Sequence, residues 1–232
     1  MKVEIWSDIV CPFCYIGKRK FEKALETFIA KDKVEIEWRS FQLDPTMEYL
    51  SGKSIHAYLA ERKGCTETEA KQMNDAVTNM AKEVGLEYNF DIAIINNTIN
   101  AHRLLHFAKT KGIQSEIKER LFHAYYTEGK NMGDIETLAS LAATVGLNAD
   151  EVKAILLSDA FTKEVELDQY YAQQVGARGV PFFVFNNKYA VSGAQPTDVF
   201  KELLEKVWKE ESPLIVQEGL TGATCAPDGT CN

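Results

Sequence analysis

The stretch that decides the fold runs from Lys2 to Gly17 and reads KVEIWSDIVCPFCYIG. Residues 2–6 combine β-branched and aromatic side chains, which favours a short strand. A Cys-Pro-Phe-Cys turn follows, and residues 12–30 have the apolar spacing of a helix. The stretch therefore predicts a strand that leads, through the closely spaced Cys11 and Cys14, into a helix.

The pattern after this helix returns to that of a strand. Residues 34–41 alternate, with Val34, Ile36 and Trp38 on one face and charged side chains on the other. Asp44-Pro45 is a turn signal that ends the strand. The first 45 residues therefore predict a β–α–β unit with the two cysteines at its first turn.

Helical periodicity dominates from about residue 54 to residue 178. Apolar residues recur there at three- and four-residue spacing. Glycines stand where the helices are expected to stop, at Gly64, Gly85, Gly112 and Gly146. We expect about six helices and interpret their apolar stripes as core packing.

Strand character reappears near the C-terminal end. Residues 182–185 form a continuous apolar run, Asn186-Asn187 supplies a turn, and residues 189–191 return as the second arm of a hairpin. A helix with one apolar face follows Pro196. We therefore predict an α/β fold in which one sheet is interrupted by an inserted all-helical domain. The predicted parts are the first part of the sheet domain, 1–50, the helical insertion, 51–175, the second part of the sheet domain, 176–209, and a tail, 210–232.

Composition limits the class of protein. Hydrophobic residues make up 45% of the 232 residues and charged residues 26%, as in ordinary soluble proteins with a core of their own. The net charge of −8 disfavours nucleic acid as a partner. No signal-peptide pattern is visible, and no apolar run approaches the roughly 20 residues that span a membrane. We expect a cytoplasmic protein without a membrane partner.

The Cys-x-x-Cys pair carries the predicted chemistry. Thiol–disulfide exchange needs a thiolate nucleophile and a second thiol that resolves the mixed disulfide. A cysteine at the first turn of a helix receives unpaired backbone N–H groups, and such cysteines have pKa values of about 3.5–7.5. Pro12 fits the first helical position. We expect Cys11 to be the exposed, attacking thiol and Cys14, on the same face and within disulfide reach, to be the more buried, resolving thiol.

The five cysteines allow more than one interpretation. Cys11 and Cys14 could form half of a zinc site, with Cys225 and Cys231 as the other half, but the gap between the last two is wider than the usual two to four residues. We favour redox chemistry and expect no metal. Cys225 and Cys231 form either a second redox pair that exchanges with the first or an inert tail. Cys65 follows a helix break and is interpreted as structural.

Three further features lie outside the cysteine motif. Gly179-Val180-Pro181 precedes the apolar run and contains either a cis proline, which would present the backbone of Val180 to a substrate, or an ordinary trans proline that starts a strand. Asp8 is interpreted as a helix cap, with proton transfer as the alternative. His102 is expected to be packed or hydrogen-bonded rather than catalytic.

These motifs together resemble the DsbA family of thiol–disulfide oxidoreductases. The resemblance is carried by Cys11-Pro12-Phe13-Cys14 and Gly179-Val180-Pro181. Four further segments are similar to the FrnE-like branch of that family: residues 7–17, residues 41–45, residues 97–98 with 101–104, and residues 191–195. The resemblance implies a thioredoxin-like fold with an inserted helical domain, Cys11 as nucleophile, Cys14 as resolving thiol and a cis Pro181. We also predict that Pro12, Phe13 and Val180 contact the substrate.

The functional hypothesis is a thiol–disulfide oxidoreductase that acts on protein or small-molecule disulfides and dithiols. No tightly bound cofactor is expected, and glutathione is a candidate thiol co-substrate. Phe13 stands where the family's periplasmic oxidants have a histidine, so the direction of electron flow stays open. Two alternatives remain: a glutathione-dependent isomerase or transferase of the same fold, and a redox-switched, chaperone-like binding module whose sensor is the Cys225/Cys231 pair.

Overall fold

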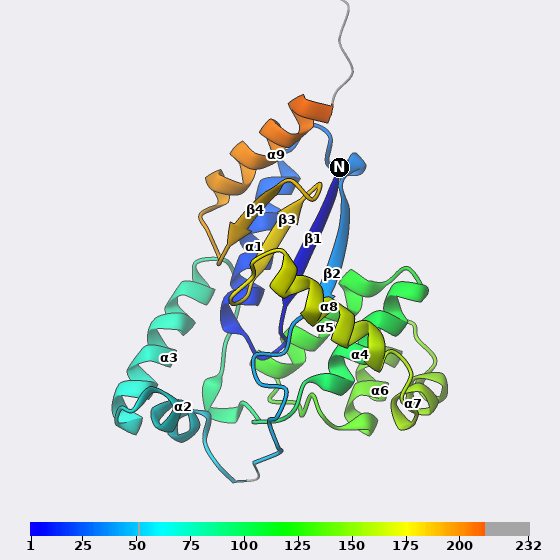
Figure 1. The fold of residues 1–232 in the computed structure, drawn as a ribbon. Coiled ribbons are helices and arrows are strands. Elements are labelled where there is room, and N and C mark those ends of the chain that lie inside the picture. Colours follow the sequence, from blue (N-terminus) through cyan, green and yellow to red (C-terminus); the bar gives the residue numbers. More distant parts are fainter. Residues whose placement is uncertain (51, 212–232) are drawn as a thin grey trace, which may run out of the picture.

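A mixed sheet of four strands forms the centre of one end of the molecule (Figure 1). The structure is a computed structural model that describes residues 1–50 and 52–211. The strand order is β2-β1-β3-β4, with β2 parallel to β1 and with β1–β3 and β3–β4 antiparallel. The strands are β1 (Lys2–Ser7), β2 (Glu35–Ser40), β3 (Phe182–Phe185) and β4 (Tyr189–Ser192).

Helices flank the sheet and form a separate layer below it (Figure 1). Seven described helices lie between β2 and β3, where the periodicity predicted about six. The difference arises among short helices, since α6 and α7 are separated by only a few residues. The helices are α1 (Pro12–Glu26), α2 (Ile55–Lys63), α3 (Glu67–Lys82), α4 (Ile99–Thr110), α5 (Gln114–Tyr126), α6 (Ile135–Ala143), α7 (Ala149–Leu157), α8 (Thr162–Gln174) and α9 (Thr197–Glu211).

The two faces of the sheet are buried against different helices. Val3 and Ile5 point to the face covered by α1 and α9, where they join an apolar core with Phe21 and Phe200. Trp6 points to the opposite face and packs with residues of α8 and β3. This alternation follows from the period of two along a strand. The first strand is therefore buried on both sides, and its end is held firmly against the start of α1.

Local signals in the sequence explain most helix boundaries. Gly64 ends α2 in the left-handed conformation, with φ 66°, and its N–H donates to the carbonyl of Ala60. This conformation costs glycine little. Thr66 and Glu69 form a capping box at the start of α3. Helix α9 continues to Glu211, slightly beyond the predicted start of the tail. None of the helices in the described part is long and apolar enough to cross a membrane.

Helix α8 lies within the predicted insertion in sequence but packs on the sheet. The Asp168 carboxylate accepts hydrogen bonds from Arg39 Nη1 at 2.9 Å and from the backbone N–H of Ser40 at 2.8 Å. The indole N–H of Trp6 donates to the backbone carbonyl of Asp168 at 2.8 Å. These bonds fix α8 across β1 and β2, so the helical layer and the sheet share one continuous packing.

Candidate active site at the start of helix α1

The Cys-Pro-Phe-Cys turn lies where β1 passes into α1. Cys11 is the N-cap residue of the helix, and Pro12 occupies its first turn as predicted. The backbone N–H of Cys14 donates to the carbonyl of Cys11 at 3.0 Å. The hydroxyl of Tyr88, from the helical layer, donates to the carbonyl of Pro12 at 2.8 Å. The turn is thereby fixed from both the helix and the helical layer.

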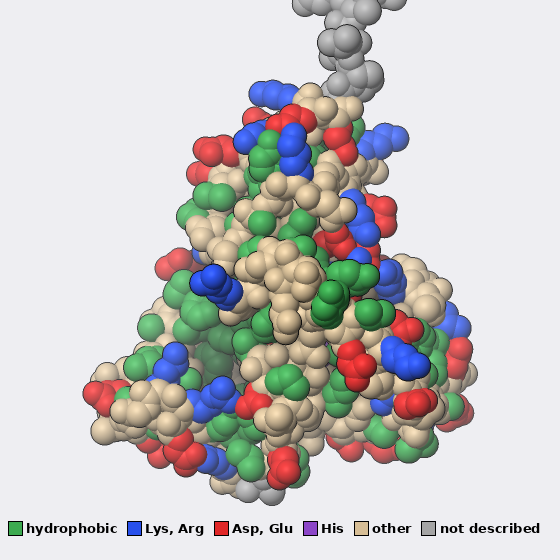
Figure 2. Space-filling model, viewed as in Figure 1, with side chains coloured by type: hydrophobic (Ala, Val, Ile, Leu, Met, Phe, Trp, Pro, Cys, Tyr) green, Lys and Arg blue, Asp and Glu red, His purple; other side chains and the backbone are tan. Residues whose placement is uncertain are grey.

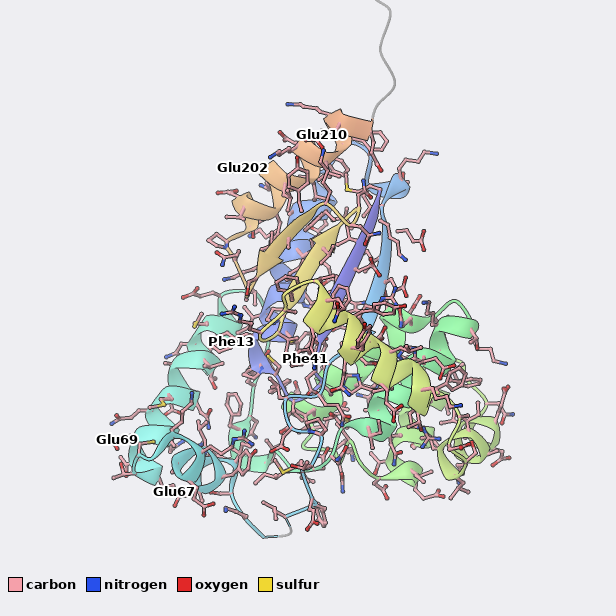
Figure 3. The ribbon with its side chains drawn as sticks, in the orientation of Figure 1. Phe13, Phe41, Glu67, Glu69, Glu202 and Glu210 are labelled. Carbon is pink, nitrogen blue, oxygen red and sulfur yellow. The ribbon has the colours of Figure 1, made fainter. Side chains whose placement is uncertain are left out.

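Cys11 is more enclosed than the sequence suggested. Its thiol donates to the carbonyl of Val180 at 3.4 Å, and the residue is only 4% exposed. The prediction of an exposed Cys11 was therefore wrong, because the loop before β3 covers the thiol. Phe13, by contrast, is 39% exposed. Figure 3 shows Phe13 at the start of α1 and Phe41 just beyond β2, both where the sheet meets the helical layer.

Cys14 faces the interior. The residue is 1% exposed. Burial, with the neighbouring Cys11 thiol as the second cause, raises the pKa of the Cys14 thiol well above its ordinary value. The charge of Lys118 and the backbone N–H of Asp8 oppose this increase. The predicted order of burial, with Cys14 deeper than Cys11, agrees with these positions.

The loop that covers Cys11 is fitted closely against α1. The Val180–Pro181 peptide bond is cis. Gly17 lies beneath it, and a Cβ at this position would stand 3.0 Å from Pro181 Cγ and 3.4 Å from Ala194 Cβ. The carbonyl of Pro181 accepts from the N–H of Gly193 at 2.8 Å. Sequence reasoning missed this role of Gly17, although a glycine within a helix is a signal of close packing.

A buried carboxylate, that of Asp8, lies three residues before Cys11 in the chain. Asp8 Oδ2 accepts from the backbone N–H of Leu43 at 2.8 Å, and Oδ1 lies 3.2 Å from His102 Nε2. The α1 N-terminus has no side-chain cap, so the interpretation of Asp8 as a cap was wrong. The expectation that His102 is hydrogen-bonded is confirmed.

The charges of this pair follow from its environment. Burial acts to raise the pKa of Asp8, but the hydrogen bond and charge of His102 outweigh it, and the pKa lies below its usual value. Burial lowers the pKa of His102 despite the attraction of Asp8. Each partner thus favours the charged form of the other, while burial opposes both charges.

Lys118 is the functional candidate that sequence reasoning missed. It is fully buried on α5, and its Nζ has no hydrogen-bond partner among the described residues. The ammonium group lies 4.8 Å from the ring centre of Phe122 and 5.5 Å from that of Trp38. Burial lowers its pKa to about 8, against the opposing charges of Cys14, Asp8 and Cys11. The available signal was a lysine within the apolar stripe that includes Ile117 and Leu121.

Two motifs noted in the sequence hold the surroundings of the site. Asn97 ties the loop after β2 to α4, since its Oδ1 accepts from Gln42 Nε2 at 2.9 Å and its Nδ2 donates to the carbonyls of Pro45 and Met47. Arg103 donates to four backbone carbonyls at the end of α7 and just beyond it, those of Ile155, Leu156, Ser158 and Ala160. These contacts are structural, and they position His102 on the α4 face that reaches Asp8.

The remaining predicted cysteines lie apart from this cluster or outside the described residues. Cys65 is a half-buried free thiol in the turn between α2 and α3. Cys225 and Cys231 lie outside the described residues, so their pairing stays a prediction. Within residues 1–50 and 52–211, no group of three or more His, Cys, Asp or Glu side chains is placed to hold a metal ion.

Comparison with known proteins places this geometry in a family. A family model described as a DSBA-like thioredoxin domain matches residues 2–205. The crystal structure of a probable DsbA oxidoreductase from Streptomyces coelicolor is 38% identical, has a TM-score of 0.85, and covers 100% of this chain and 98% of its own. The predicted thioredoxin-like fold with a helical insertion is confirmed.

Two further proteins are similar over most of the chain. YwbO of Bacillus subtilis, described as uncharacterized, is 29% identical over 224 residues, which are 90% of this chain and 98% of that protein. The structure of the cytosolic disulfide reductase DsbM from Pseudomonas aeruginosa with GSH is 14% identical, has a TM-score of 0.63, and covers 90% of this chain and 100% of its own. At that identity, the second similarity shows the fold alone.

Proposed function

This chain belongs to the family of DSBA-like thioredoxin domains, and from that premise we propose that it is a thiol–disulfide oxidoreductase in which Cys11 attacks and Cys14 resolves. One observation carries the assignment of roles. Cys11 stands at the N-cap of α1 beside the Val180 carbonyl, while Cys14 is buried behind it with a raised pKa. A nucleophile at the helix N-terminus and a protonated reserve thiol are what two-step exchange requires.

The first step exchanges one disulfide bond for another. The Cys11 thiolate attacks a sulfur of the substrate disulfide, the new Cys11–substrate bond forms, and the old S–S bond breaks. The leaving sulfur departs as a thiolate with the electron pair and takes up a proton from solvent. The backbone of Val180 and the ring of Pro12 border the attacked sulfur in this proposal, and the exposed Phe13 offers an apolar contact to the substrate.

The second step releases the substrate. Cys14 loses its proton and attacks Cys11 Sγ, so the Cys11–Cys14 disulfide forms and the mixed disulfide breaks. The enzyme has then lost two electrons and the substrate has gained them. Two molecules of a low-molecular-weight thiol such as glutathione would return the enzyme to its dithiol form: they supply two electrons and two protons and leave as one disulfide. The reverse sequence oxidises a substrate dithiol.

Lys118 bears on the second step in particular. Cys14 must become an anion in a buried site, where an isolated charge is costly. The Lys118 ammonium favours that anion and has no hydrogen-bond partner of its own in the described part of the chain. We assign it the role of a positioning residue that stabilises charge on Cys14 without touching the substrate. A cytoplasmic site of action, as for the cytosolic disulfide reductase of similar fold, is part of the proposal.

The test separates the two cysteines. Cys11→Ser should reduce insulin or a model disulfide no faster than the free reducing thiol does. Cys14→Ser should instead accumulate a mixed disulfide with the substrate, visible by mass spectrometry. Cys65→Ser is the matched control and should keep turnover. Full activity of Cys11→Ser would overturn the proposal, and activity of Cys14→Ala on a small electrophile with glutathione would favour the isomerase or transferase alternative.

A further inference from the structure

A cavity of about 450 Å³ lies directly beside the Cys-Pro-Phe-Cys turn. Val10 and Pro12 of the turn form one wall, and Ile55 and Leu59 of α2 contribute to the wall opposite. Figure 2 shows a hollow with apolar walls on this side of the molecule, between α3 and the rest of the chain. Any occupant of the cavity would therefore lie against the residue that follows Cys11.

The lining of the cavity is mainly apolar. Besides the four residues above, its apolar residues are Leu43, Met47, Phe90 and Ile95, and its uncharged polar residues are Tyr58, Asn74, Asn96, Thr98 and Tyr125. Ligand pockets for small molecules typically have volumes of about 300–1,000 Å³, apolar walls and a few placed polar groups. Two loops tied together by Asn97 supply Met47 and Ile95, so this wall is held in place without an occupant.

The charge at the rim is unbalanced. Arg62 is neutralised by Asp44, at 2.6 Å, and also donates to the hydroxyl of Tyr58 at 2.7 Å. Lys63, beside it, has no ion pair among the described residues. The carboxylate of Asp8, at the inner end, is already bonded to His102 and to the N–H of Leu43. The one unpaired charge of the lining in the described part is thus positive.

These observations lead us to propose that the cavity binds the organic body of a low-molecular-weight disulfide or thiol that carries a carboxylate on an aromatic or similarly bulky apolar group. The apolar body would fill the space between Pro12 and Leu59, and the carboxylate would lie near Lys63. The sulfur would then border Cys11. The part of this inference that concerns sulfur rests on the proposed function, and it uses the same two exchange steps.

Glutathione fits this cavity less well than such a molecule. It carries two carboxylates and an ammonium group, whereas Lys63 is the one unpaired charge of the lining among the described residues, so its further charges would lose water without gaining a partner. An apolar pocket gains binding free energy with each well-placed methylene-sized group of its ligand. We therefore expect glutathione to serve as the recycling thiol and an apolar acid to be the better ligand of the cavity.

Binding is tested first in the Cys11→Ser protein, so that no exchange occurs. The probe is 2-naphthoate, and its neutral isostere 2-naphthamide and reduced glutathione are measured beside it by calorimetry. We expect the order naphthoate, naphthamide, glutathione in decreasing affinity. Lys63→Gln should lower the affinity for naphthoate about 2- to 5-fold, as for the loss of an exposed charge pair, and leave the affinity for naphthamide unchanged. Lys163→Gln, on the exposed side of α8, is the matched control and should change neither.

Filling the cavity gives a second, independent measurement. Leu59→Trp should abolish naphthoate binding, and Met47→Trp, in a loop, should do the same if Leu59→Trp does not fold. Unchanged binding in a folded filling variant, or equal affinity for naphthoate and glutathione, would overturn the inference.

Exchange kinetics of protein that keeps Cys11 distinguish this inference from the proposed function. We expect Lys63→Gln to slow the exchange of the protein with the disulfide 5,5′-dithiobis(2-nitrobenzoate) about 2- to 5-fold. The rate of exchange with neutral 4,4′-dithiodipyridine should not change. Normal exchange without naphthoate binding to the cavity would refute the inference and leave the proposed function intact. Binding without any exchange would keep the cavity as an acid-binding site and refute the redox function.

Discussion

Cys11 and Cys14 are three residues apart on one turn of helix, yet they face two different parts of the molecule. Cys11 meets the Val180 carbonyl and stands next to a cavity with an unpaired cation at its rim. Cys14 meets a closed interior that holds the buried Lys118. The helix sets the spacing between the two thiols. The elements packed around them give each thiol a different environment. The division of labour that we propose, with attack by Cys11 and resolution by Cys14, would thus follow from tertiary packing.

The largest effect expected from this difference is in thiol reactivity. We compare alkylation by iodoacetamide in Cys11→Ser and Cys14→Ser proteins that also lack Cys65, Cys225 and Cys231. Because burial raises the pKa of Cys14 well above its ordinary value, little of the thiolate that alkylation requires is present at pH 7. We expect Cys14 to react at least about 100-fold more slowly than Cys11. Equal alkylation rates for Cys11 and Cys14 would show that the two thiols do not have different environments.

Lys118→Met tests the interior side of the site. A buried lysine whose pKa is about 8 carries a cost that is complete below pH 8 and is lost as the pH rises toward its unfolded value of 10.5. The unfolded chain binds the proton in that window and the folded chain does not, so stability increases with pH there. The variant should gain on the order of 3 kcal/mol at pH 7, and the gain should vanish by about pH 10.5.

The measurement is urea unfolding across pH in proteins without the two active-site thiols, whose own titration would overlap. Lys163→Met is the exposed control and should show no such pH dependence. In the protein that keeps its thiols, Lys118→Met should slow release of the mixed disulfide and leave its formation unchanged. If formation slowed equally, Lys118 would not act through Cys14.

Much of the fold could be predicted from local patterns, and the reasons are physical. The hairpin at Phe182–Phe185 is marked by an apolar run and an Asn-Asn turn, and both asparagines have positive φ. The β–α–β unit at the start of the chain is marked by apolar residues whose spacing changes from that of a helix to that of a strand. By contrast, α8 reads like any other amphipathic helix. Its place on the sheet depends on Asp168 meeting Arg39, 129 residues away, and no local pattern specifies that contact.

The site was predicted where it is local in sequence and missed where distant segments meet. The Cys-x-x-Cys spacing, the N-terminal position and Pro12 belong to one turn and were foreseen. The enclosure of Cys11 depends on Val180, 169 residues away, and the burial of Lys118 depends on which face of α5 turns inward. Asp8 was misassigned because its partners, Leu43 and His102, come from other elements. The FrnE-like branch and the domain boundaries stay predictions.

Gly17→Ala tests the fit between α1 and the loop over Cys11. The added methyl would stand 3.0 Å from Pro181 Cγ, and the ring cannot yield far because the Pro181 carbonyl is bonded to Gly193. Overpacking of this kind costs about 1–3 kcal/mol, against about 1 kcal/mol of helix propensity gained. We expect a net loss of about 1 kcal/mol by urea unfolding, together with slower exchange at Cys11. Increased stability with unchanged exchange would show that the fit is loose.

Phe13→His should have a modest effect and should act on the Cys11 side alone. Phe13 lies between the two cysteines in the first turn of α1, and its partly exposed ring has room for a polar replacement. An imidazole there adds a hydrogen-bond donor for the Cys11 thiolate and so stabilises the dithiol form, which makes the disulfide more oxidising. A single such bond of about 1.4 kcal/mol corresponds to an increase of roughly 30 mV in reduction potential, measured against glutathione buffers. Phe13→Leu, which adds no donor, should leave the potential unchanged. Because Cys14 faces the interior, its slow alkylation should persist in Phe13→His, and a parallel change in both thiols would mean that the two environments are coupled through the turn.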